Sequence, residues 1–347
     1  MGGFWAGKRV CITGGTGFLG WQIARQLLDL HAEVRVLALP PDAGHPIHRE
    51  ARFGTYFGDV RDPVIVQRAL QGCPVVFHTA GVVGAWRKLL EVMWSVHREG
   101  TANVLKFADA DARIVHTSSL TTIGGTRGGE ILTEESPFNR EGTKIAYVQA
   151  KRAAENAALQ AATEGRDVVV TNPGYLVGPE DYERSIMGRF CVRFWKGRIP
   201  LAPPGGFNLV DVRDVATGHL LAAERGQRGR RYLLGGENHR FPSFEKLLAQ
   251  VAHYRPRGLP RVPWILLAAM AGFAELRSRL NGKEPYPSMG HVRLNRYCWF
   301  GSSQRASDEL GYTARPLLDS LRDSFAWHNG HDPIRPRGLN RWWIRPS

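Results

Sequence analysis

The stretch that most constrains the fold of this chain is a short apolar run that leads directly into a glycine-rich turn. Residues 8–20 read KRVCITGGTGFLG, and the turn holds Gly14, Gly15, Gly17 and Gly20. The run predicts a buried strand, and residues 18–30 have the apolar spacing of a helix. Glycines at such a junction let a pyrophosphate reach backbone N–H groups at the positive end of the helix. The spacing matches G-x-G-x-x-G, so we predict a dinucleotide site here.

The composition is that of a globular chain. Its 347 residues are 43% hydrophobic and 22% charged, enough to bury a large core. Its four cysteines are scattered without a C-x-x-C pair, which predicts neither a zinc site nor a disulfide framework and favours a reducing compartment. The N-terminus lacks a long apolar segment, so we expect no signal peptide and a cytoplasmic protein.

Positive charge is concentrated in the C-terminal third. Of the net charge of +14, residues 1–223 carry 25 Lys and Arg against 22 Asp and Glu, whereas residues 224–347 carry 21 against 10. Such a region can meet an anionic substrate or an acidic membrane surface, or can reflect an arginine-rich proteome. No nucleic-acid-binding motif accompanies the charge, so we expect no nucleic-acid partner.

One apolar segment in that third has two interpretations. Residues 262–276 read VPWILLAAMAGFAEL, too short a run to span a bilayer. It predicts either a buried helix or a helix at a membrane surface, since arginines flank it on both sides. The tail segment RWWIR at 341–345 has a similar mixture of aromatic and cationic residues. A peripheral membrane contact therefore stays open.

Strand and helix signals alternate through the first 235 residues. Strand-like runs lie at 33–39, 75–78, 113–117, 167–171 and 231–234. This alternation predicts an α/β fold with a doubly wound parallel sheet. We expect a dinucleotide-binding domain over 1–177, its sheet completed by strands from 208–235. A smaller lobe, mainly for substrate binding, is expected over 178–330, followed by a basic and aromatic tail over 331–347.

Two residues downstream of the glycine turn have the spacing of an acid–base pair. Tyr147 and Lys151 are four residues apart in a helix-forming stretch, so both lie on one helical face. A phenol has a pKa near 10, and an adjacent ammonium together with an oxidised nicotinamide would favour the phenolate. The strand before this helix ends in Thr117, Ser118 and Ser119. A serine there can bind a substrate oxygen while Tyr147 moves the proton.

With these residues in place, the chain resembles an extended short-chain dehydrogenase/reductase of the NAD-dependent epimerase/dehydratase superfamily. The resemblance covers roughly residues 8–327. The motifs follow in family order: TGGTGFLG (13–20), GDVRD (58–62), VVFHTAG (75–81), EGTANVL (99–105), VHTSS (115–119), NPGYLVGP (172–179) and LVDVRDVA (209–216). The resemblance implies a Rossmann fold, a nicotinamide cofactor, a small-molecule substrate and, as in many members, a homodimer built through the Tyr147 helix.

The resemblance also implies roles for single residues. Ser119, Tyr147 and Lys151 would form the catalytic triad, with Lys151 also holding the nicotinamide ribose. The cofactor would be bound by Gly14, Gly17, Phe18, Leu19, Gly20, Leu39, Asp59, Val60, Thr79, Ala80, Gly81, Thr117, Lys151 and Pro173. No metal is implied.

The chain departs from the family pattern where the second strand ends. NAD-preferring members place an acid there and NADP-preferring members an arginine, whereas this chain has Ala38 and Leu39. Because no carboxylate would repel a 2′-phosphate, and Arg49 and Arg52 follow, the sequence favours NADP, with NAD as the alternative.

Further departures narrow the substrate. Phe207 stands where nucleotide-sugar enzymes carry an arginine for the diphosphate, and Leu120 and Thr121 replace the Asp-Glu pair of dehydratases. His97 replaces a family asparagine, most simply as a structural residue. These features resemble dihydroflavonol 4-reductase-like, 3β-hydroxysteroid-dehydrogenase-like and hopanoid-associated sugar epimerase-like members.

The resulting hypothesis is an NAD(P)-dependent oxidoreductase acting on a carbonyl or secondary alcohol of a bulky, largely apolar or polyol substrate. A sugar or polyol epimerase is the alternative, and a non-catalytic NAD(P)-binding protein a weaker one. Six large apolar residues would either line the substrate pocket or pack in the core: Trp86, Met93, Trp94, Phe190, Trp195 and Trp264.

Overall fold

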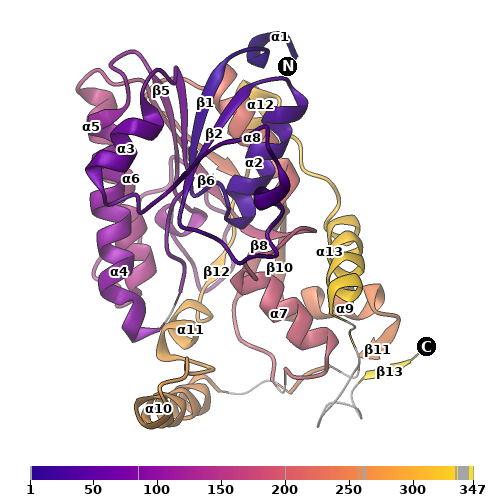
Figure 1. Cartoon of the computed structure of the whole chain (residues 1–347). Helices are drawn as coiled ribbons and strands as arrows, with labels where there is room; N and C mark the ends of the chain where they lie inside the picture. The colour runs from indigo at the N-terminus through magenta and orange to yellow at the C-terminus, as the bar shows by residue number, and fades with distance from the viewer. Residues whose placement is uncertain are drawn as a thin grey trace.

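A seven-stranded sheet forms the larger part of the molecule (Figure 1). The computed structural model describes residues 2–84, 86–199, 201–256, 258–260, 263–332, 334 and 344–346. The sheet has the order β3-β2-β1-β4-β5-β6-β9, and every neighbouring pair is parallel. Its strands are β1 (Arg9–Thr13), β2 (Glu33–Ala38), β3 (Gly54–Phe57), β4 (Val75–His78), β5 (Arg113–Thr117), β6 (Val168–Pro173) and β9 (Arg231–Leu234). The strand order reverses between β1 and β4, which is where such sheets bind ligands.

Helices cover both faces of this sheet, so its central strands are buried on both sides. One face packs against α2 (Phe18–Asp29), α8 (Val212–Arg225) and α12 (Gln304–Leu310). The other packs against α3 (Pro63–Leu70), α5 (Thr101–Phe107) and α6 (Ala146–Thr163). Strands β4 and β6 are buried at every position. The predicted doubly wound α/β fold is confirmed.

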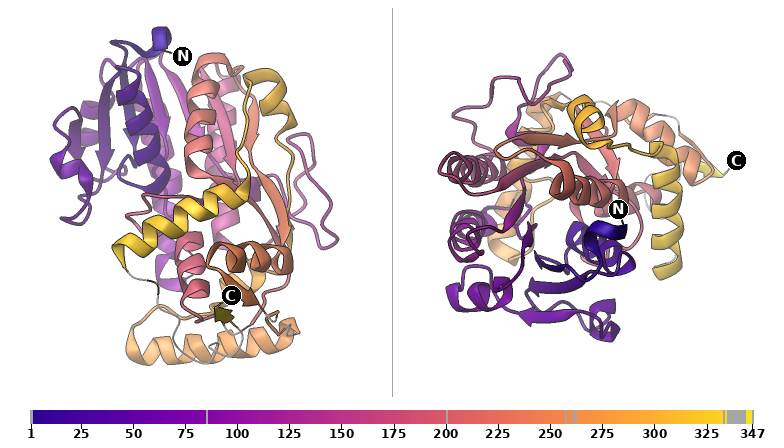
Figure 2. Two further views of the ribbon diagram at one scale, coloured as in Figure 1. Left: turned by 90° about the vertical axis from the view of Figure 1, so that its right-hand side faces the viewer. Right: turned by 90° about the horizontal axis from the view of Figure 1, so that it is seen from above.

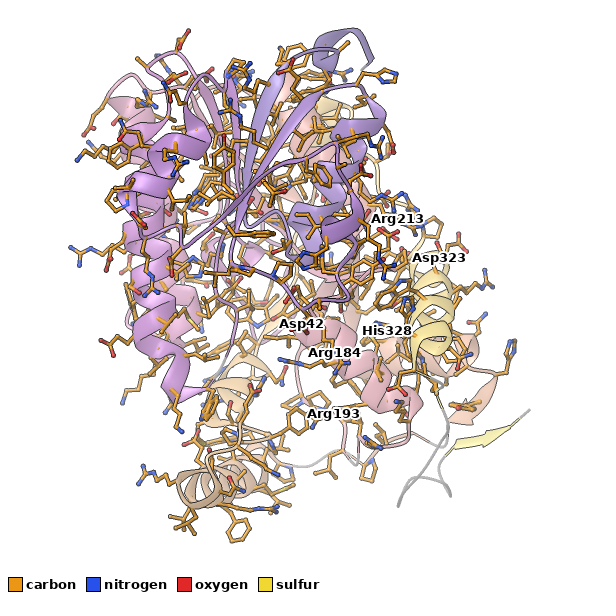
Figure 3. All side chains as sticks on the ribbon, viewed as in Figure 1. Asp42, Arg184, Arg193, Arg213, Asp323 and His328 are labelled. Carbon is orange, nitrogen blue, oxygen red and sulfur yellow. The ribbon has the colours of Figure 1, made fainter. Side chains whose placement is uncertain are left out.

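A second, smaller sheet stands at the carboxyl edge of the first. Its strands are β7 (Tyr175–Val177), β8 (Gly206–Asp211), β10 (Glu237–Arg240) and β12 (Cys298–Trp299), with β8 at the centre. Around it lie α7 (Ile186–Trp195), α9 (Phe241–Val251) and α13 (Leu317–His331). Arg213 of α8 donates to Asp323 of α13 at 2.6 Å, which ties this lobe to the main domain (Figure 3).

The strands expected from 208–235 divide between the two sheets. β9 joins the large sheet, but β8 lies in the small one. Strand β8 can pack on both lobes because the side chains of successive strand residues point to opposite faces. Phe207 and Leu209 are buried in the core of the small lobe, whereas Val210 is buried in the core of the main domain.

A third group of elements forms one end of the molecule. Helix α10 (Trp264–Asn281) lies crosswise there, followed by the short helix α11 (Met289–Leu294) (Figure 2, left). Strands β11 (Tyr254–Pro256) and β13 (Ile344–Pro346) pair nearby. Short elements complete the chain: α1 (Gly2–Trp5), η1 (Pro46–Arg49), η2 (Arg87–Leu89), α4 (Leu90–Ser95), η3 (Val96–Gly100) and η4 (Leu120–Thr122). Among the described residues, no helix is both long and apolar enough to cross a bilayer. Most of the expected basic and aromatic tail, including 341–343, lies outside them.

Candidate active site

The glycine turn between β1 and α2 is packed too tightly for side chains. Gly14 has a φ of +72°, and a Cβ placed on it would come within 2.7 Å of the Ala80 Cα. A Cβ on Gly20 would run into the carbonyl oxygen of Gly14. Glycine is therefore required both for the backbone conformation of the turn and for its contact with the next strand.

The start of α2 fits an anionic group. Gly17 caps the helix and has no side chain to accept a hydrogen bond from the first turn. Phe18 and Leu19 begin the helix, and their N–H groups belong to the set that finds no partner within a helix. A pyrophosphate is the acceptor that such a cradle takes, so the residues present fit a dinucleotide.

The end of β4 forms one wall beside this turn. The Thr79 hydroxyl donates to the Thr13 carbonyl at 2.7 Å, and the Ala80 N–H donates to the Thr13 hydroxyl at 3.3 Å. A Cβ on Gly81 would come within 2.6 Å of the His97 ring. The structure therefore brings Thr79, Ala80 and Gly81 next to the glycine turn.

Asp59, Val60 and Leu39 lie on the other side of the turn, at the ends of β3 and β2. Asp59 accepts bonds from the Arg61 side chain, whose hydrogen bonds lower the pKa of the Asp59 carboxyl. Asn103 holds this loop by donating to the carbonyls of Val60 and Arg61 at 3.1 and 2.9 Å. Leu39 is largely exposed at the end of β2.

Lys151 lies beneath the carboxyl end of β5. Its ammonium donates to the Thr117 carbonyl at 2.8 Å, and the side chain is buried. Burial lowers the pKa of Lys151 to about 8, and the charge of Glu155 opposes that shift. Lys151, one member of the predicted acid–base pair on α6, thus contacts the predicted strand end directly.

Tyr147 is half-buried one turn earlier on α6, and the Ser119 side chain lies beside its hydroxyl. Burial raises the pKa of the Tyr147 phenol, and the Ser119 side chain opposes that shift. The sequence-based expectation of a lowered pKa includes the charge of an oxidised nicotinamide, so it stays a prediction for the cofactor complex. In the protein alone, the Lys151 ammonium bonds the Thr117 carbonyl, and the loss of water around the phenol is the larger effect.

A buried polar network holds the Ser119 segment. The Glu155 carboxylate is fully buried and accepts from the Thr122 hydroxyl at 2.6 Å and the Asn172 amide at 2.7 Å. Asn172 also donates to the Ser119 carbonyl at 3.2 Å. The sequence analysis missed Glu155 and Asn172. The signals available were the position of Glu155 four residues after Lys151 and the Asn-Pro pair that ends β6.

His97 lies in the π-helical turn η3, next to Tyr147. Its ring is 6.4 Å from the Tyr147 ring, and its Nε2 is 3.1 Å from the Val82 carbonyl oxygen. Burial, and then the Lys151 charge, lower the pKa of His97 to about 3. A π-helical turn is a common mark of a functional site.

The six large apolar residues expected in a substrate pocket or in the core do not share one environment. Met93 is fully buried, and Trp195 and Phe190 belong to the core of the small lobe with Phe241 and Phe244. Trp94 and Trp264 are exposed. Met93, Phe190 and Trp195 are therefore core residues, and Trp94 and Trp264 are surface residues. Pro173 does lie at the end of β6, beside the Asn172 network.

Comparison with known proteins gives concordant matches. The family model described as NAD dependent epimerase/dehydratase family matches residues 10–235. A putative dihydroflavonol 4-reductase of Synechocystis sp. is 32% identical, over 93% of this chain and 95% of its own length. Sterol demethylase protein B of Methylococcus capsulatus is 31% identical, over 94% and 98%.

Solved structures agree with the fold. The crystal structure of gox2253 is 30% identical with a TM-score of 0.81, covering 94% of this chain and all of the other. The dTDP-glucose 4,6-dehydratase DesIV of Streptomyces venezuelae, solved with NAD bound, is 23% identical with a TM-score of 0.73 over 96% and 98% of the two chains. The second match supports the fold alone.

Proposed function

Because this chain belongs to the NAD-dependent epimerase/dehydratase family, we propose that it is an oxidoreductase for a bulky, largely apolar or polyol substrate with a carbonyl or secondary alcohol. The observation that carries the proposal is the arrangement at the end of β5, where Ser119 lies beside the Tyr147 hydroxyl and Lys151 bonds Thr117. Two relatives, named for a dihydroflavonol reductase and a sterol demethylase, support a ring-containing, apolar substrate.

Each residue has a separate task in this proposal. A bound nicotinamide supplies the hydride acceptor or donor at its C4 atom. In reduction, the Tyr147 hydroxyl donates its proton to the carbonyl oxygen, and in oxidation the phenolate takes the proton from the alcohol. Ser119 donates a hydrogen bond to the same oxygen. The buried charge of Lys151 favours the phenolate and holds the cofactor ribose.

A direct test measures cofactor turnover. The purified protein is incubated with NADPH and a panel of steroid, flavonoid and polyol ketones, and NADPH loss is compared with alcohol formed. We expect one NADPH consumed per alcohol. Binding of NADPH and NADH is measured by nicotinamide fluorescence. Failure to bind both cofactors would contradict the proposal.

Epimerisation is the second candidate, and the family match favours it because that family includes epimerases by name. An epimerase oxidises and re-reduces one carbon, so it would convert substrate with no net cofactor change. One residue argues against a nucleotide-sugar substrate: Phe207 is buried against Tyr175, with ring centroids 5.2 Å apart, and supplies no charge for a diphosphate. Product formation without NADPH loss would favour this second candidate.

We also propose that NADP is preferred over NAD. Strand β2 ends without a carboxylate, and Arg49 of η1, which follows it in the chain, is the guanidinium that we assign to the 2′-phosphate. Arg52, the other candidate, is already paired with Glu50 through two bonds of 2.7 and 2.6 Å. Arg49→Ala should weaken NADPH binding about tenfold and leave NADH binding unchanged. Arg52→Ala should change the binding of neither cofactor.

Two further proposals concern assembly and location. A homodimer through the helices at α6 is supported by Val92 and Trp94, which are exposed on α4 beside it. Trp94→Glu should then shift the protein to a monomer in analytical ultracentrifugation. A cytoplasmic location, with contact to a membrane surface, is supported by four unpaired, buried cysteines and the basic C-terminal third.

A further inference from the structure

Helix α10 uses only a narrow strip of its surface to pack on the protein. Its buried residues are Leu267, Ala271 and Ser278, which are spaced to share one face. Leu267 and Ala271 form a small cluster with Val292 of α11. The rest of this 18-residue helix stands clear of the core.

The opposite face of α10 is apolar. Ile265, Phe273, Leu276 and Leu280 are 65%, 70%, 57% and 86% exposed, and Ala269 lies among them. These residues are three or four positions apart, so they form one stripe facing away from the protein. A surface helix of a water-soluble domain ordinarily carries charged residues on that face. Here the pattern is reversed.

Cations and amphipathic aromatic residues border the stripe. Arg277 and Arg279 are exposed on the last turns of α10. The Arg296 guanidinium lies 4.4 Å from the Trp264 ring, and the Arg193 guanidinium lies 4.0 Å from the Tyr286 ring. Figure 3 shows Arg193 on the side of the lobe that faces α10. Such a border suits the headgroup layer of a bilayer, where aromatic rings and arginine stems sit between water and lipid.

The position of α10 allows its whole length to meet a plane. It lies along one end of the molecule, opposite the N-terminus, and the described elements all lie to one side of it (Figure 2, left). An 18-residue helix is about 27 Å long, so the stripe is extended rather than a single spot.

We propose that α10 docks flat on an anionic lipid bilayer, with its apolar stripe inserted among the lipids and Arg277 and Arg279 at the headgroups. Charge decides between this occupant and a second copy of the chain. Residues 224–347, which include α10, carry 21 Lys and Arg against 10 Asp and Glu, so this part of the molecule attracts an anionic surface and repels its own counterpart in a second copy. The inference does not depend on the proposed reaction.

The docked helix is connected to the candidate active site. The Glu275 carboxylate of α10 accepts from the Met289 N–H of α11 at 2.9 Å. One turn later on α11, Arg293 donates to the Lys144 carbonyl at 3.3 Å, three residues before Tyr147. If the proposed function holds, a lipid-dissolved substrate would arrive at the lobe that contacts the start of α6.

The first experiment places a fluorophore on the stripe. All four native cysteines are buried, so Phe273→Cys can be labelled selectively with a nitrobenzoxadiazole dye. Val64→Cys on α3, where Val64 is 63% exposed, is the matched control on the main domain. With vesicles of phosphatidylcholine and phosphatidylglycerol, the dye at 273 should shift to the blue and brighten severalfold, and the dye at 64 should not change. No change at 273, or an equal change at both positions, overturns the proposal.

The second experiment separates lipid docking from self-association. Phe273→Glu with Leu276→Glu should reduce co-sedimentation with the same vesicles at least tenfold, whereas Val64→Glu should leave it unchanged. Arg277→Ala with Arg279→Ala should weaken binding and reduce its sensitivity to salt. Because these side chains are exposed, the melting temperature should not fall. If the wild type ignores vesicles but the Phe273 and Leu276 variant dissociates a dimer in ultracentrifugation, a second copy covers the stripe and the proposal is wrong.

Discussion

Two regions of the molecule depart in opposite directions from the usual distribution of polar and apolar residues. One is the buried corner formed by Lys151 and the polar network around Ser119, and the other is the end formed by α10. The corner buries Glu155, Asn172 and Ser119, whereas α10 exposes Ile265 and Leu280. The buried groups lose water, and most of their polar atoms find partners inside the chain, whereas the Asn172 Oδ1 has none among the described residues. The exposed apolar groups have no cover among the described residues. The first departure is therefore largely resolved internally, and the second indicates a partner outside the chain.

The largest effect should come from the reacting group of the corner. Tyr147→Phe removes the proton donor and should lower kcat by about 10²- to 10⁴-fold, while the dissociation constant for NADPH stays nearly constant. Steady-state rates and fluorescence titration measure the two quantities. Tyr175→Phe, the same change on β7, should cost far less, and equal losses in both variants would contradict the assignment.

The stability of the corner should depend on its buried carboxylate. Glu155→Ala leaves Arg152 and Arg231 without their common partner and should lower the free energy of unfolding by about 3–5 kcal/mol. The exposed pair of Arg322 and Asp319 is the contrast, since Asp319→Ala should cost less than about 1 kcal/mol. Urea denaturation compares them, and similar losses would mean that burial of the charge is unimportant.

The corner should also make the protein acid-sensitive. His219 of α8 lies at the end of β5, where its Nε2 is 3.0 Å from the Thr117 hydroxyl. Burial lowers the pKa of His219 to about 4, so between pH 6.5 and 4 the unfolded chain binds a proton that the folded chain does not. Stability should therefore fall as pH falls through this range, by about 1.4 kcal/mol per pH unit for this histidine. His219→Gln should remove that share of the slope in urea midpoints measured from pH 7 to 5. An unchanged slope would show that His219 is protonated in the fold.

The smallest effect should be found on the outer face of α10. Leu280→Lys should change the free energy of unfolding by less than about 0.5 kcal/mol, because the side chain already lies in water. Leu267→Ala, on the inner face of the same helix, should cost about 2 kcal/mol or more. Equal costs would show that the two faces are not distinct in solution.

Local patterns were sufficient to predict the glycine turn, the parallel sheet and the positions of Tyr147 and Lys151. Each depends on residues close together in the chain or on strand alternation. The Glu155–Asn172 contact joins a helix to a strand 17 residues later, and no local spacing indicates it. The direction of the Tyr147 pKa shift depends on how much water the fold removes. The split of the strands from 208–235 depends on which of two cores each residue meets.

Strand β8 gives Phe207 and Leu209 to one core and Val210 to the other. A shared strand of this kind leaves no hinge between the two lobes. Neither lobe can melt without stripping apolar contacts from its neighbour, so heat should unfold both in one cooperative step. Substrate entry must then come from rearrangement of loops or of the α10 end rather than from the lobes swinging apart.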